Sequence, residues 1–166
     1  MNKKIITLTG FMGCGKSYIS KILARELGYN LIDADAQIVK NQGKSIPQIM
    51  SEVGEQGFRQ IEKEVISNLL KQDFLVLSAG GGAILHNADL LLEGSTVVFL
   101  DADFDLCYNR IKNDKNRPLA FGKTREQVFD IYSKRIEIYQ KNCHFSVKND
   151  DAYQTVKKIK EFLKNY

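Results

Sequence analysis

The chain has 166 residues, of which 43% are hydrophobic and 27% charged, which suits one globular domain with a sizeable core. Its net charge of +4 allows attraction of anionic ligands but is too small to indicate a nucleic-acid partner. Three cysteines without a C-x-x-C pair indicate neither a disulfide framework nor a zinc site, and no stretch is typical of a secretory leader or a membrane span. We therefore expect a cytoplasmic protein with no membrane partner.

The first predicted elements are a strand, a glycine-rich loop and a helix. Residues 4–9 form an apolar run typical of a buried strand, and an apolar stripe over residues 17–27 predicts a helix. The segment between them, GFMGCGKS from Gly10 to Ser17, fits the phosphate-binding pattern G-x-x-x-x-G-K-[ST]. In this pattern backbone amides converge on phosphate, Lys16 reaches the β/γ oxygens, and the Ser17 hydroxyl can hold Mg²⁺. The segment therefore predicts nucleotide binding at a helix N-terminus.

The rest of the chain alternates between predicted strands and helices. Mostly apolar runs predict strands at residues 30–33, 74–78, 96–100 and 144–148. Helices are expected after residue 33, from Ser45, over 58–69, from Asn87, over 104–112, from Thr124 with Gln127 completing a capping box, and from Asp150. Such alternation predicts an α/β fold of three αβα layers, in which a parallel sheet has helices on both faces.

Two carboxylates, Asp33 and Asp35, follow the second predicted strand. Ligands of parallel sheets bind outside the carboxyl ends of the strands, which is also where the phosphate loop is expected. One carboxylate can orient a metal-bound water, and the other can accept a hydrogen bond or a proton from an acceptor hydroxyl. Helix capping is the alternative, since aspartate is a good N-cap. Beside a phosphate loop we favour the functional interpretation.

Arg59 and the run Gly80–Gly82 are candidates for an acceptor pocket. Arg59 lies just off the apolar stripe of its helix, so it forms either a weak surface ion pair with Glu62 or a fork that binds a substrate carboxylate. A generic turn needs one glycine, and three are costly unless the backbone must approach something closely. We interpret the glycine run as a wall of the acceptor pocket.

The segment at residues 113–123 is polar and basic and is expected to be a loop. It contains Arg117, and Arg110 and Arg125 lie on either side of it. A mobile basic loop can close over a transferring phosphoryl group and exclude water. An ordinary solvated loop would have the same composition, and the pattern alone leaves both interpretations open. Arg135 lies in the next predicted helix, where a charged helix face explains it adequately.

Together these motifs resemble the shikimate kinase family over nearly the whole chain. The matching segments, in the family's order, are the phosphate loop, Asp33-x-Asp35, Gly57-Phe58-Arg59-x-x-Glu62, Gly80-Gly81-Gly82, Arg117-Pro118-Leu119 and Arg135. The resemblance implies ATP-dependent phosphorylation of the shikimate 3-hydroxyl, on the route to chorismate and the aromatic amino acids. It also implies a nucleoside-monophosphate-kinase-like fold with a five-stranded parallel sheet. Residues 1–166 would form one domain, with a substrate-binding region at about 35–61 and a lid at about 113–123.

The same resemblance implies roles for individual residues. The implied ATP contacts are Gly13, Cys14, Gly15, Lys16, Ser17, Tyr18, Arg110 and Arg117. The implied shikimate contacts are Asp35, Arg59, Gly80, Gly81, Gly82 and Arg135, with the two arginines on the carboxylate. Lys16, Asp35 and Arg117 are the implied catalytic residues, Asp35 being the candidate base, and Ser17 and Asp33 would serve Mg²⁺. The implied partners are the small molecules shikimate and ATP, and we expect a monomer.

Two alternatives stay open. Another small-molecule kinase of this fold, acting on gluconate or a nucleoside monophosphate, would also use Arg59 and Arg135, which can hold a phosphate as well as a carboxylate. Asp35 favours a polyhydroxy acceptor, because a carboxylate would repel a phosphate acceptor. A nucleotide-dependent switch without a small acceptor is the second alternative. A guanine-specific switch is expected to have an N-K-x-D run, which the sequence lacks, and it would not explain the glycine run.

Overall fold

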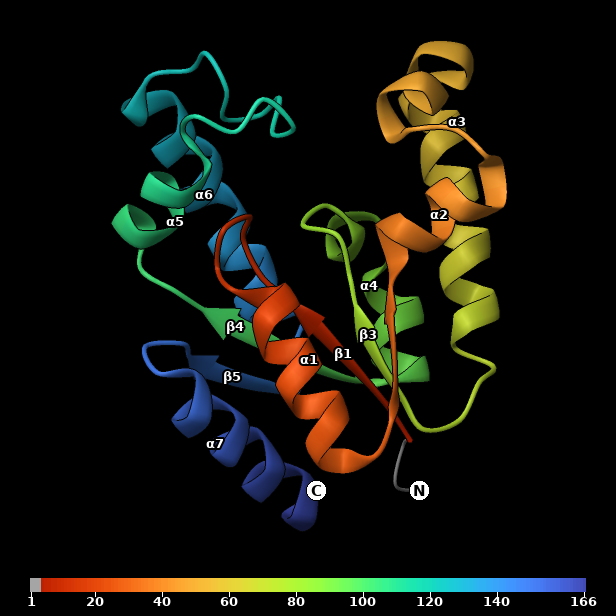
Figure 1. The fold of residues 1–166 in the computed structure, drawn as a ribbon, viewed down its shortest axis with the longest axis vertical. Coiled ribbons are helices and arrows are strands. Elements are labelled where there is room, and N and C mark those ends of the chain that lie inside the picture. Colours follow the sequence, from red (N-terminus) through yellow and green to blue (C-terminus); the bar gives the residue numbers. More distant parts are fainter. Residues whose placement is uncertain (1–3) are drawn as a thin grey trace.

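The computed structural model describes residues 4–166, which form a five-stranded sheet with helices on both faces (Figure 1). The strand order is β2-β3-β1-β4-β5, and every neighbouring pair is parallel. The strands are β1 Ile5–Thr9, β2 Asn30–Asp33, β3 Leu75–Ser78, β4 Thr96–Asp101 and β5 Phe145–Lys148. The predicted three-layer α/β fold with a five-stranded parallel sheet is therefore confirmed.

The helices of residues 4–166 form two layers around the sheet. They are α1 Lys16–Leu27, α2 Ala34–Gln42, α3 Ile46–Leu69, α4 Ala83–Gly94, α5 Phe104–Ile111, α6 Arg125–Lys141 and α7 Ala152–Asn165. Helices α1 and α7 pack together on one face, whereas α4 and α6 cover the other, with α3 beside α4. Above the sheet in Figure 1, α2 and the first part of α3 stand on one side, and the loop after α5 stands on the other.

Burial distinguishes the central strands from the edge strands. β1, β3 and β4 are buried over nearly their whole length, because helices cover both faces of the sheet there. β2 and β5 lie at the edges, and most of their residues are exposed or half-buried. The apolar runs predicted as strands are therefore buried at the centre of the sheet, whereas the two edge strands are partly exposed, because one side of each has no neighbouring strand.

The strand order brings three sequence motifs together at the carboxyl ends of neighbouring strands. β1, β2 and β3 are adjacent, and in register Asp33 pairs with Ser78, which in turn pairs with Leu8. The carboxyl ends of these strands therefore lie at one level. The phosphate loop leaves β1 there, Asp35 follows β2, and the glycine run from Gly80 follows β3.

Helix α3 is longer than the sequence pattern predicts. Its start is confirmed: Ser45 accepts a hydrogen bond from the Gln48 amide, and the Gln48 side chain accepts one from the Ser45 amide, which completes a capping box. The helices expected from Ser45 and over 58–69 are one helix with a kink at Gly54, where φ is 73°. The predicted capping box of α6, Thr124 with Gln127, is also present.

Two predicted helix starts differ in the structure. The last helix is capped by Asp151 and not by Asp150, because the Asp151 carboxylate accepts a hydrogen bond from the Gln154 amide at 2.8 Å. The helix predicted from Asn87 is the second part of a longer helix with a kink at this residue. Helix α4 begins at Ala83, directly after the glycine run, and Asn87 lies inside it with the non-helical values φ −131° and ψ 28°.

Residues 113–123 form an irregular loop between α5 and α6, as the composition predicts. Most of its side chains are exposed, but Ala120 is fully buried and fixes one point of the loop against the protein. None of the helices within residues 4–166 has the length and apolar character needed to cross a bilayer.

Candidate active site

The phosphate loop joins β1 to α1 and has the backbone geometry of an anion cradle. Gly15 is the N-cap of α1 and has a φ of 96°, a left-handed conformation that favours glycine. Helix α1 begins at Lys16, so its first amides and the positive end of its dipole face the loop cavity. The Lys16 ammonium donates a hydrogen bond to the Gly10 carbonyl across the loop at 2.9 Å. It is thereby held over the position where phosphate oxygens would enter.

Two side chains from distant elements, Asn149 and Arg110, donate hydrogen bonds to carbonyl oxygens of this loop. Asn149, after β5, donates from its amide nitrogen to the Cys14 carbonyl at 2.7 Å, and Thr155 of α7 donates to the Asn149 side-chain oxygen at 3.0 Å. Arg110 of α5 donates to the Gly13 carbonyl at 2.9 Å. Sequence reasoning missed Asn149, because no local pattern connects it with a loop 135 residues away.

Cys14 shapes the turn of the loop. Its amide donates to the Phe11 carbonyl at 3.1 Å, and its buried thiol lies near Gly10, where a Cβ would come within 2.7 Å of the sulfur. Cys14 and the exposed Tyr18 both line the loop cavity. Their predicted contacts with ATP stay predictions.

Two cavities meet at the carboxyl edge of the sheet. The first, of about 470 Å³, is lined by the phosphate loop from Met12 to Tyr18, Asp33, Asp35, the start of the glycine run, Arg110 and Arg117. The second, of about 250 Å³, is lined by Asp35, Arg59, Glu62, the glycine run, Arg135, and residues of α3 and of the loop after α5. Met12, Asp35, Gly80, Gly81 and Arg117 line both cavities. A group in the first cavity can therefore reach a group in the second beside Asp35.

Asp35 is a partly buried carboxylate in the first turn of α2. Burial raises its pKa above the ordinary value of 3.8, as do the negative charges of Asp33 and Glu62, whereas Lys16 and Arg117 act in the opposite direction. A Cβ at Gly80 would come within 2.9 Å of both Asp35 oxygens, so only glycine lets the carboxylate lie this close to the turn. A raised carboxylate pKa favours proton acceptance near neutral pH.

Arg59 reaches the second cavity from α3 as one half of a largely buried ion pair. It donates from Nη1 to Oε1 of Glu62 at 2.9 Å, and Glu62 is only 2% exposed. Of the two alternatives for Arg59, the weak surface pair does not describe its setting, because Glu62 is shielded from water. The Nε of Arg59 is buried and has no hydrogen-bond partner within the described chain. A Cβ at Gly82 would come within 2.9 Å of Nη2, so glycine is again required for the approach.

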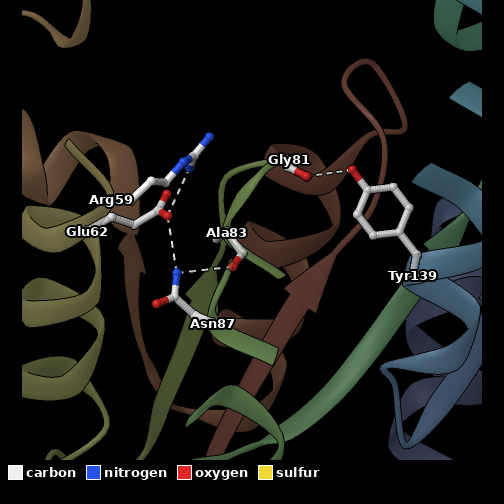
Figure 2. A network of polar contacts seen from close by, with 6 residues as sticks. All are labelled: Arg59, Glu62, Gly81, Ala83, Asn87 and Tyr139. Carbon is white, nitrogen blue, oxygen red and sulfur yellow. Dashed lines mark hydrogen bonds and ion pairs between the residues drawn. The ribbon is translucent and has the colours of Figure 1, made fainter. Parts of the chain in front are cut away.

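Tyr139 ties the glycine run to α6. Its hydroxyl donates to the Gly81 carbonyl at 2.6 Å, and burial raises its pKa to about 12, so it stays a hydrogen-bond donor (Figure 2). Arg135, one turn earlier in α6, lines the second cavity together with Arg59. Sequence reasoning missed this hydrogen bond.

The basic residues around the loop 113–123 have different positions. Arg117 is exposed, lies 3.6 Å from the Asp114 carboxylate and lines both cavities. Arg110 lines the phosphate cavity but not the second cavity. Arg125 forms an exposed ion pair with Asp105 of α5 and lines neither cavity, so the structure does not bring it to the site.

Ser17 and Asp33 both line the phosphate cavity, as expected for a site that serves a metal ion. Oδ1 of Asp33 accepts the amide hydrogen of Ala36 at 2.9 Å, so this carboxylate also caps α2. Within residues 4–166, no three side chains of His, Cys, Asp or Glu form a ready-made metal cluster. A hydroxyl, one carboxylate, water and phosphate oxygens are the hard ligands that suit Mg²⁺.

A phosphate cradle that shares one carboxylate with an arginine-lined acceptor cavity defines a class: a P-loop kinase that phosphorylates a small molecule. Comparison with known proteins agrees with this class, since the family model described as shikimate kinase matches residues 12–164. The chain belongs to the shikimate kinase family.

Individual relatives match over almost the full length of the chain. The shikimate kinase of Persephonella marina is 40% identical over 157 residues, which cover 93% of this chain and 95% of the relative. The shikimate kinase of Staphylococcus haemolyticus is 37% identical over 170 residues, which cover 100% of this chain and 96% of the relative. Among solved structures, shikimate kinase from Acinetobacter baumannii in complex with shikimate matches with a TM-score of 0.89 and 32% identity, covering 98% of this chain and 93% of the other.

Proposed function

We propose that the protein transfers the γ-phosphoryl group of ATP to the 3-hydroxyl of shikimate. The observation that carries this proposal is the sharing of Asp35 between the phosphate cavity and the arginine-lined cavity. The second cavity suits a polyhydroxy carboxylic acid: it has Arg59 and Arg135 for a carboxylate and Asp35 for a hydroxyl. The related enzyme from Acinetobacter baumannii was solved in complex with shikimate, which supports this acceptor.

The mechanism follows from the position of each group. Amides of the phosphate loop and the Lys16 ammonium bind the β/γ phosphates, and Arg117 meets the transferring group from the loop above. Arg59 and Arg135 fix the acceptor by its carboxylate, so that its 3-hydroxyl faces Asp35. Asp35 takes the proton as the hydroxyl oxygen bonds to the γ-phosphorus, and ADP leaves with the electrons of the broken P–O bond. We assign residues 113–123 as a lid that excludes water, and residues 35–61 as the substrate-binding region of a single domain.

Mg²⁺ fits the oxygen donors at the phosphate cavity. Ser17 and Asp33 would hold it, the latter through water as in the family that the chain resembles, and one Asp33 oxygen also caps α2. When bound, Mg²⁺ neutralises charge on the β/γ oxygens. Removal of divalent cations with a chelator is expected to abolish turnover and leave shikimate binding in place.

We place the protein in the cytoplasm as a monomer. Its three cysteines are free, as is usual in a reducing compartment. One chain supplies all of the residues assigned here to the two substrates, so the site needs no second copy. Light scattering after size-exclusion chromatography tests the oligomeric state.

The acceptor is tested by a coupled assay of ADP release with shikimate, gluconate and AMP, each as the single acceptor. Turnover is expected with shikimate alone. Turnover with AMP or gluconate but not with shikimate would overturn the proposal. Hydrolysis that no acceptor changes would favour a nucleotide switch.

Replacing Arg59 by alanine is expected to raise the KM for shikimate on the order of 100-fold, because a buried charge-assisted contact to a carboxylate is lost. The KM for ATP should stay unchanged, since Arg59 does not line the phosphate cavity. Steady-state kinetics with each substrate varied in turn measure both values. Arg59→Lys keeps the charge without the fork and should recover only part of the binding.

Arg25→Ala is the matched control for Arg59→Ala, because Arg25 is an exposed arginine in the last turn of α1. It should change neither KM. Equal losses of shikimate and ATP binding in Arg59→Ala would contradict the pocket assignment.

A further inference from the structure

Asn87 occupies a special position in helix α4. It is 5% exposed, and its φ of −131° and ψ of 28° depart from the helix on either side of it. It lies one turn after Ala83, where α4 leaves the glycine run, and it faces α3 (Figure 2). A buried amide side chain is expected to have hydrogen-bond partners, so the partners of Asn87 show what holds it there.

The Asn87 amide nitrogen makes two hydrogen bonds that join the two walls of the acceptor cavity. It donates to Oε1 of Glu62 at 3.1 Å and to the Ala83 carbonyl at 3.1 Å. The same Oε1 accepts from Nη1 of Arg59 at 2.9 Å. Figure 2 shows the resulting chain of contacts, from the turn at Ala83 through Asn87 and Glu62 to Arg59.

The chemistry of a buried ion pair explains what Asn87 contributes. The Glu62 carboxylate is shielded from water, so it needs several hydrogen-bond donors to stay charged and to keep one orientation. Arg59 supplies one of these donors and Asn87 another. If Asn87 is lost, Glu62 can rotate or take up water, and the guanidinium it holds is no longer aimed at the cavity. Asn87 does not itself line the second cavity; it contacts Glu62, which does.

We propose that Asn87 is a positioning residue for acceptor binding: through Glu62 it fixes the guanidinium of Arg59 in the orientation that receives the acceptor carboxylate. This inference rests on the proposed function, since it takes shikimate as the acceptor. It adds a residue that does not touch the substrate, and it couples the orientation of the arginine to the backbone at the end of the glycine run.

The direct test is Asn87→Leu, which has nearly the same volume and donates no hydrogen bond. Shikimate binding, measured by calorimetry, should weaken roughly tenfold, as for the loss of a hydrogen bond to a charged group. The shikimate KM should rise by the same factor, while kcat and the KM for ATP change less than about twofold. An unchanged shikimate affinity would overturn the inference.

Thr7→Val is the matched control for general destabilisation. Thr7 and Ser95 form a buried hydroxyl pair at 2.7 Å, remote from the two cavities, so this variant also loses a buried hydrogen bond. Its melting temperature should fall, with the shikimate KM unchanged. If Thr7→Val and Asn87→Leu raise the shikimate KM equally, then Asn87 acts only through stability.

A double-mutant cycle tests whether Asn87 acts through Arg59. In the Arg59→Ala background, Asn87→Leu should have no further effect on shikimate affinity, because the group it positions is absent. The same roughly tenfold loss in both backgrounds would place its effect elsewhere and overturn the inference.

Asn87→Asp offers a second variant with its own signature. An ionised aspartate beside the Glu62 carboxylate repels it, whereas a protonated aspartate can donate to it as the amide does. Shikimate affinity of this variant should recover severalfold as the pH is lowered from about 8 to about 6, because protonation removes the repulsion between the two carboxylates and restores a donor. The charged or titratable side chains around this position are Arg59, Glu62, Lys63 and Glu55 of α3 and His86 of α4.

Asn87→Leu and the wild type have the same neighbours, including His86, so their pH profiles serve as the reference. A recovery as large in either of them would show that the pH effect does not come from the introduced aspartate and would overturn the inference. Shikimate turnover by the wild type separates failure of the proposed function from failure of this inference. If the proposed function is wrong, the wild type does not turn over shikimate. If only this inference is wrong, that turnover is intact.

Discussion

Asp35→Asn is expected to lower kcat by about 10²-fold or more, because asparagine keeps the shape of the side chain but cannot accept the proton of the attacking hydroxyl. Shikimate should still bind, since Arg59 and Arg135 remain in the second cavity. Steady-state kinetics measure kcat, and calorimetry with shikimate measures binding separately. A near-normal kcat would reduce Asp35 to a residue that positions the hydroxyl.

The pH dependence provides an independent check on Asp35. Its carboxylate must be ionised to act as a base, so kcat/KM should fall as the pH falls through its folded-state pKa, and this fall begins above the ordinary value of 3.8. Burial is the first cause of that raised pKa, followed by the charges of Asp33 and Glu62. The acidic limb should be missing from the residual activity of Asp35→Asn.

The same raised pKa has a consequence for stability with a definite sign. Between 3.8 and the folded-state pKa, the folded protein binds more protons than the unfolded chain, so stability falls as the pH rises through this window. At neutral pH the ionised Asp35 therefore opposes folding. Asp35→Asn should melt at a higher temperature than the wild type at pH 7, and the difference should shrink below pH 3.8.

Features that are local in the sequence were predictable. The phosphate loop is a contiguous motif, so Gly10–Ser17 could be placed between a strand and a helix without knowledge of the fold. The capping boxes at Ser45 and Thr124 also depend on residues three apart. The gathering of Lys16, Asp35 and the glycine run followed from a general property of parallel sheets, namely that ligands bind at the carboxyl ends of the strands.

Features that depend on long-range packing were not predictable. Asn149 holds the phosphate loop from a position 135 residues away, and Tyr139 reaches Gly81 across 58 residues. Nothing local to Asn87 distinguishes a helix cap from a buried amide that contacts Glu62 on another helix. The burial of Glu62 was missed for the same reason, because the helix stripe gives the face of α3 but not what covers it.

The glycine run shows how partial such a prediction is. Sequence reasoning interpreted Gly80–Gly82 as a wall that backbone must approach closely, and the structure gives the cause at two of the three positions. A Cβ at Gly80 would meet the Asp35 carboxylate, and a Cβ at Gly82 would meet the Arg59 guanidinium, each at 2.9 Å. The three consecutive glycines indicated that the backbone here needs space. They did not indicate which side chains, Asp35 and Arg59, occupy that space.

Lys16→Met is expected to lower kcat on the order of 10³-fold, because it removes a positioned cation from the charge that develops on the transferring phosphoryl group. The Lys16 ammonium is already held over the phosphate loop by the Gly10 carbonyl, and a nucleotide phosphate would offer it a charged partner instead. Shikimate binding should be unchanged, since Lys16 does not line the second cavity. Single-turnover measurement of phosphoryl transfer, with shikimate calorimetry beside it, separates the two effects.

The control for Lys16→Met is Lys21→Met, which removes the same charge from an exposed position on the same helix. Its kcat should stay close to that of the wild type, so a loss specific to Lys16 reports on location and not on net charge. Because the Lys16 charge also lowers the pKa of Asp35, the acidic limb of kcat/KM should move to higher pH in Lys16→Met. If Lys16→Met loses activity but leaves this limb in place, then the Lys16 charge does not influence the ionisation of the Asp35 carboxylate. A kcat within tenfold of the wild type would show that the loop binds the nucleotide without stabilising its transfer.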